Sequence, residues 1–141
     1  MTYRYAPQYG VKILQLVVLV EALIRGLAYV LTPQVSLLVA TDITESAPVY
    51  TWGAAFLFFS VLGLFGEALM SGANVAPGGT PRAWPSFIAH AGLMILYATL
   101  TLAYANAVFN GQDNLASAPA AVAAFAYVHW MFARKRSGHV S

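Results

Sequence analysis

Several ionisable side chains interrupt long apolar stretches of this sequence, where a charge or an imidazole requires an explanation. They are Glu21, Arg25, Glu67, His90 and His129. Glu21 and Arg25 stand four positions apart, the spacing of neighbours on one helix face, so they are predicted to form an ion pair. The pair either fixes helix packing or offers the carboxylate of a small exporter. Because the arginine would occupy that carboxylate, packing is favoured.

Glu67, His90 and His129 form a second candidate set, predicted to lie at one depth within a bundle. At 1.5 Å per residue, each is about 6–9 Å from the same end of the bundle. Two histidines and a carboxylate suit a metal ion, and two histidines on facing helices suit haem b. The alternative is a group of packed polar side chains that contains a hydrogen-bonded Glu–His contact. No catalytic residues and no other cofactor are predicted.

The segments that must position these residues are long and apolar. Residues 52–70 carry a single ionisable group, and a helix of roughly 20 apolar residues matches the hydrocarbon thickness of a bilayer. The chain is 60% hydrophobic and 9% charged, whereas soluble domains are about 25% charged. We therefore predict an all-α membrane protein, a single domain over 1–141 forming an antiparallel bundle of four transmembrane helices. The predicted spans are 11–32, 50–70, 86–109 and 116–133.

The ends of these helices are predicted from local chemistry. Pro33 stops the first helix because proline cannot continue the hydrogen-bond ladder. Ser86 is placed to cap the third helix, and the triplet Arg134, Lys135 and Arg136 is expected to end the fourth in water. The sequence contains no cysteine, which excludes a disulfide framework and a thiolate metal site.

Small residues at helical spacing predict close helix packing, since lipid gives helices no hydrophobic reason to associate. They are Gly53, Ser60 and Gly63 on the second helix and Ala120 and Ala124 on the fourth. These stripes either close the bundle or present a face to another copy of the chain.

The basic residues predict the orientation, because positively charged loops remain in the cytoplasm. Four spans place one group on the same side: Arg4, Lys12, Arg82, Arg134, Lys135 and Arg136. The other side holds Asp42, Glu45 and Asp113. Both termini are therefore expected to be cytoplasmic and the protein to lie in the inner (plasma) membrane. The net charge of +2 is too small to indicate a nucleic-acid partner.

The sequence carries aromatic and histidine landmarks: Trp52–Gly53 opening the second helix, Trp84 before the third helix with its Tyr97, and His129–Trp130 leading into the basic tail. This pattern resembles small four-helix holin-like membrane proteins of tailed bacteriophages. This resemblance implies accumulation in the host inner membrane and association into lesions that let an endolysin through. LIRG (23–26) and GLFGEAL (63–69) are also similar to the DoxX-like family, from which no residue roles are carried over.

These observations lead to alternative functional expectations. The first is a self-associating or scaffolding membrane protein without enzymatic activity, whose partners are the lipid bilayer and either further copies or a larger membrane complex. The second is an accessory or redox subunit that uses Glu67, His90 and His129. A small exporter that depends on Glu21 is the third.

Overall fold

The computed structural model describes residues 8–32, 48–71 and 81–140. Its long helices are α1 (Gln8–Leu31), α4 (Val49–Ser71), α5 (Trp84–Phe109) and α6 (Ala118–Val140), with short 3₁₀ turns η1 (Pro81–Ala83) and η2 (Asp113–Leu115). The four long helices are each long and apolar enough to cross a membrane. The predicted helical class is therefore confirmed, and no strand occurs within the described ranges.

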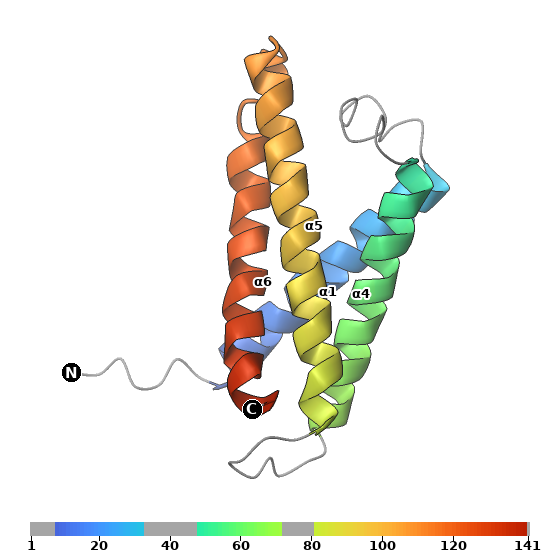
Figure 1. Ribbon diagram of the computed structural model, residues 1–141, viewed down its shortest axis with the longest axis vertical. Helices are drawn as coiled ribbons and strands as arrows, with labels where there is room; N and C mark the ends of the chain where they lie inside the picture. The colour runs from blue at the N-terminus through green and yellow to red at the C-terminus, as the bar shows by residue number, and fades with distance from the viewer. Residues whose placement is uncertain (1–7, 33–47, 72–80, 141) are drawn as a thin grey trace, which may run out of the picture.

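The helices pack mainly with their neighbours in the chain: α1 with α4, α4 with α5, and α5 with α6. In Figure 1, α5 and α6 run side by side, while α1 begins near the end of α6 and crosses diagonally behind α5 towards the beginning of α4. Contact between α1 and α6 is consequently slight. The start of α1, η1 and the end of α6 lie at the same end of the molecule, and we call it the basic end because Lys12, Arg82 and Arg134–Arg136 are there.

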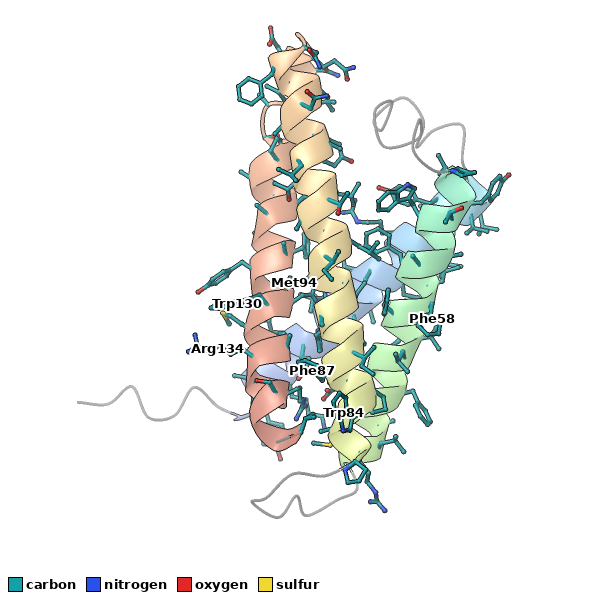
Figure 2. All side chains as sticks on the ribbon, in the orientation of Figure 1. Phe58, Trp84, Phe87, Met94, Trp130 and Arg134 are labelled. Carbon is teal, nitrogen blue, oxygen red and sulfur yellow. The ribbon has the colours of Figure 1, made fainter. Side chains whose placement is uncertain are left out.

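Apolar side chains occupy both the interior and the outer surface. Leu19, Phe56, Leu93 and Tyr97 are fully buried in the core. Large apolar side chains also point outwards, and Leu102 is 72% exposed. Figure 2 shows Phe58 on α4 and Trp130 on α6 pointing away from the other helices. A surface this apolar suits contact with lipid or protein rather than with water.

The small residues on α4 pack within the molecule. A Cβ added at Gly53 would lie 2.7 Å from Val30 Cγ2, and one at Gly63 would lie 2.5 Å from Leu19 Cδ2. Ser60 is fully buried and donates a hydrogen bond to the carbonyl of Leu57. Because both glycine positions are crowded by α1, they allow α1 and α4 to approach closely. Ala120 and Ala124 of α6 are instead exposed and do not close the described bundle.

Two helix ends differ from the predictions. The residue that caps α5 is Ala83, without a side-chain cap, and Pro85 lies in the first turn. Ser86 is therefore not the cap; its hydroxyl faces another helix, as described below. Helix α6 does not stop at Ala133 but continues through the basic triplet to Val140. Because arginine and lysine are good helix formers, the helix continues beyond the point where the apolar stretch ends.

Candidate functional site

Glu67 of α4 is the centre of a buried group of polar side chains near the basic end. Its carboxylate accepts hydrogen bonds from Gln15 Nε2 at 2.7 Å, Ser86 Oγ at 2.6 Å and Arg136 Nη2 at 2.9 and 2.7 Å. These donors come from α1, α5 and α6 respectively. One carboxylate thus connects all the long helices. We call Gln15, Glu67, Ser86, His90, His129 and Arg136 the basic-end cluster.

A glycine next to Glu67 allows this convergence. A Cβ added at Gly66 would lie 2.5 Å from the backbone nitrogen of Ser86 and 2.9 Å from its Cα. Those atoms are backbone and cannot turn aside as a side chain could. The absence of a side chain at Gly66 therefore lets the first turn of α5 come close enough for the Ser86 hydroxyl to reach Glu67. Here α4 and α5 are held at backbone contact distance.

The two histidines of the cluster contact each other directly. His90 Nδ1 lies 2.8 Å from His129 Nδ1, and Gln15 Nε2 lies 3.0 Å from His90 Nε2. The amide nitrogen of Gln15 must donate to the Glu67 carboxylate, so its second hydrogen is available for His90. In the neutral ring, His90 therefore accepts at Nε2 and donates from Nδ1 to His129. His129 then carries its own proton on Nε2.

Aromatic rings hold the imidazoles in place. His129 stacks on Tyr97 with ring centroids 5.3 Å apart and planes inclined by 12°. His90 packs against Phe132 at 5.2 Å, and Phe125 covers another part of Tyr97 at 5.4 Å. Both histidines are fully buried. His129 Nε2 has no hydrogen-bond partner within the described residues.

A second polar group lies near the middle of α1, and we call Glu21, Arg25 and Tyr97 the central cluster. Arg25 donates to Glu21 Oε1 from Nε at 3.0 Å and from Nη2 at 2.6 Å, so the predicted ion pair is confirmed. The Tyr97 hydroxyl donates to Glu21 Oε2. The Arg25 guanidinium also lies 5.5 Å above the Tyr97 ring centre, a cation–π contact.

The structure brings Glu67, His90 and His129 into one cluster but does not arrange them as a set of metal ligands. Within the described ranges, no group of three His, Cys, Asp or Glu side chains is placed to hold a metal ion. Glu67 pairs with Arg136 and reaches His90 only through Gln15. The two imidazoles touch at Nδ1, which leaves no gap between them for a porphyrin. The arrangement is instead suited to holding helices together and to exchanging protons.

Sequence reasoning missed several members of these clusters. Gln15, Ser86 and Arg136 were not predicted as partners of Glu67, and Tyr97 was not predicted to bond Glu21. One signal was available: Arg136 follows His129 by seven residues, two helical turns, so both lie on one face if the helix continues. The expectation that α6 ended at Ala133 concealed that signal.

Comparisons with known proteins give no relative for this chain. No protein-family model matches it, and no curated protein and no solved structure is significantly similar to it.

Proposed function

We propose that this chain is a multi-pass membrane protein that works by self-association in the bilayer, in a holin-like manner and without enzymatic activity. The outward face of α1 is the surface through which copies meet. Four helices that are long and apolar enough to span a membrane support the bilayer setting. The central cluster supports the association.

The observation that carries the proposal is the partial exposure of an ion pair near the middle of a spanning helix. The side chain of Glu21 is 27% exposed and that of Arg25 is 21% exposed. Both border a groove of about 650 Å³ along α1 that is otherwise lined mainly by apolar side chains, among them Val17, Val20 and Ile24. Ionisable groups that face lipid cost a few kcal/mol each near the bilayer centre. A protein surface laid over this groove removes that cost.

A second copy of the same chain is the occupant that the charges favour. A two-fold interface brings the same patch of both subunits together, so that residue i meets residue j and j meets i. A patch with one carboxylate and one guanidinium a helical turn apart is complementary to itself. Glu21 of each copy can approach Arg25 of the other, while the flanking valines and Ile24 pack together.

A further exposed face supports growth beyond pairs. Ala120 and Ala124 are exposed on α6, and small residues allow close helix–helix approach in membranes. If α1 and α6 both make contacts between copies, the assembly does not close at two subunits. Such growth is what a holin-like lesion requires.

The basic end is proposed to lie in the cytoplasm, with both termini. Lys12, Arg82 and Arg134–Arg136 are at this end, and Asp113 is at the opposite end. The positive-inside tendency orients such a protein. Trp84 and Trp130 lie in the half of the molecule nearer the basic end, and Arg134 lies 5.5 Å over the ring of Trp130, as expected for side chains near the headgroups. Arg4, Asp42 and Glu45, which also entered this prediction, lie outside the described residues.

Cysteine cross-linking in membranes tests the interface, because the natural chain contains no cysteine. Ile24→Cys places a thiol on the α1 groove at a residue 61% exposed, and Val61→Cys places one on the outer face of α4 at a residue 55% exposed. We expect oxidation to give dimers with Ile24→Cys and few with Val61→Cys. Equal yields at both positions, or none at Ile24→Cys, would contradict the proposed interface.

The holin-like behaviour has its own test. Overproduction of the natural chain is expected to abolish the membrane potential and to stop growth. The double variant Glu21→Leu/Arg25→Leu, produced at the same level, is expected to do so later or not at all. Cells that keep their potential and viability at high levels of the natural chain would rule out this behaviour.

A further inference from the structure

Polar side chains form a continuous row through the interior of the molecule, from the basic end to the middle of α1. The row begins with the basic-end cluster and reaches His129, which stacks on Tyr97. Tyr97 then bonds Glu21, and Glu21 bonds Arg25. Tyr104 lies two helical turns beyond Tyr97 on α5 and is also buried. The row therefore joins the two named clusters.

Only some members of the row can both accept and release a proton. Carboxylates, imidazoles and phenols can do so, whereas arginine keeps its proton and the glutamine amide does not ionise. The groups capable of transfer between the basic end and the middle of the molecule are Glu67, His90, His129, Tyr97 and Glu21. Chains of Asp, Glu and His inside membranes are typical of proton relays.

Among the groups of the row that can transfer a proton, His129 has incomplete hydrogen bonding within the described residues, and outside these groups Arg136 Nε is likewise buried without a partner. His129 Nδ1 accepts from His90, so the proton of His129 is on Nε2, and that atom is buried without a partner within the described residues. A buried donor without an acceptor is costly. The free N–H lies in a ring stacked on Tyr97, whose hydroxyl already donates to Glu21.

We infer that this row carries protons between the basic end and Glu21. Gln15 Nε2 binds both the Glu67 carboxylate and His90 Nε2. When that amide turns aside, the carboxyl proton of protonated Glu67 passes to His90 Nε2, directly or through one water. The Nδ1 proton of His90 then moves to His129 Nδ1.

The remaining transfers complete the balance. The Nε2 proton of His129 moves to the Tyr97 oxygen through one intervening water, as the hydroxyl proton of Tyr97 moves to Glu21. Glu67 is left as a carboxylate, Glu21 is protonated and Tyr97 is unchanged. Both imidazoles remain neutral but have exchanged tautomers, and rotation of the rings restores the starting state. One proton has then advanced without any net redox change.

Proton flux into liposomes tests this relay. The purified natural chain is reconstituted at a low protein-to-lipid ratio with a pH-sensitive dye and carboxyfluorescein inside separate vesicle batches. A potassium gradient with valinomycin supplies the driving potential. We expect acidification that rises linearly with the amount of protein, while carboxyfluorescein is retained. Flux no greater than in protein-free vesicles would overturn the inference, as would flux accompanied by release of carboxyfluorescein.

Substitutions separate a relay from a packing role. His129→Gln keeps a side chain that can donate and accept hydrogen bonds but cannot pass a proton, and it is expected to lower the flux at least tenfold. Glu21→Gln should do the same. Thr99→Ala is the matched control, because the Thr99 hydroxyl only returns to Ile95 of its own helix, and it should leave the flux unchanged. A His129→Gln protein that is folded, as judged by helical content and elution volume, and that gives the same flux as the natural chain would also overturn the relay.

The relay and the proposed self-association can fail independently. The relay lies within one chain and is measured where flux is proportional to protein. The interface is measured by cross-linking at Ile24→Cys. Flux without cross-linking would leave the relay standing and remove the interface, and cross-linking without flux would do the reverse.

Discussion

The basic-end cluster and the central cluster are both built around a glutamate and an arginine, yet they differ in what covers them. Glu67 is 4% exposed and receives donors from three other helices. The Glu21 side chain is 27% exposed and is bonded by a neighbour on its own helix and by Tyr97 of α5. The first carboxylate is satisfied within one chain. The Glu21 carboxylate has its charge paired but remains partly exposed. We therefore assign fold stability to the basic-end cluster and association to the central cluster.

The largest effect that tests this contrast is expected from Glu67→Ala. Removal of one partner of a buried ion pair leaves the other charge uncompensated and costs about 3–5 kcal/mol. Here Arg136, Gln15 and Ser86 would all lose their acceptor. We expect the free energy of unfolding in detergent to fall by that amount, measured by titration with a denaturing detergent.

Glu67→Gln is the matched variant for this measurement. It keeps an acceptor oxygen for Ser86 but loses the charge that faces Arg136, so it should retain part of the stability. A loss below about 1 kcal/mol in Glu67→Ala would show that the basic-end cluster does not hold the helices together, and the contrast with the central cluster would fail.

The next largest effect is expected from Gly66→Ala. The new Cβ would lie 2.5 Å from the backbone nitrogen of Ser86, so α4 and α5 must move apart, and overpacking of this kind costs about 1–3 kcal/mol. Gly138→Ala is the control, because a Cβ there meets nothing within 4 Å. Thermal unfolding in detergent should separate the two variants, with Gly138→Ala at or above the natural chain. Equal unfolding temperatures for all three proteins would mean that the close approach at Ser86 is not needed.

A smaller effect on the fold is expected from Glu21→Leu/Arg25→Leu. Both charges are removed together, so neither is left unpaired. The Tyr97 hydroxyl loses its acceptor, and polar contacts between membrane helices are worth about 0.6 kcal/mol on average. The free energy of unfolding should therefore change by less than about 1 kcal/mol. The cross-linking yield of Ile24→Cys should nevertheless fall severalfold when the double substitution is added. If the double variant unfolds easily but still cross-links at Ile24→Cys, the central cluster stabilises the fold and does not mediate association.

The parts of this structure that depend on local sequence were predictable, and those that depend on distant contacts were not. The four helices follow from apolar length, and α1 ends at Leu31, close to the predicted stop at Pro33. The pair Glu21–Arg25 follows from spacing along one helix. The bond from Tyr97 to Glu21 joins residues 76 positions apart, and no local pattern encodes it.

The basic triplet shows how a correct observation led to a wrong boundary. Arg134, Lys135 and Arg136 mark the place where the chain leaves an apolar setting, and the triplet predicts the end of the helix there. The helix continues, and the continuation turns Arg136 back to Glu67 at 2.7 Å. Because the helix is predicted to end at Ala133, the prediction misses both the extent of α6 and the ion pair between Arg136 and Glu67.

The smallest effect is expected at Ser60, which gives a control for the importance of contacts between helices. Ser60 and Ser86 are both fully buried, but the Ser60 hydroxyl donates to Leu57 of its own helix, whereas the Ser86 hydroxyl donates to Glu67. Ser60→Ala should change the free energy of unfolding by less than about 0.5 kcal/mol, because the lost bond does not join two helices and alanine is the better helix former. Ser86→Ala removes a hydrogen bond to a charged group and should cost about 1.5–3 kcal/mol. Detergent unfolding of the two variants side by side checks this, and similar losses at both positions would indicate that burial of a hydroxyl matters more here than the carboxylate it reaches.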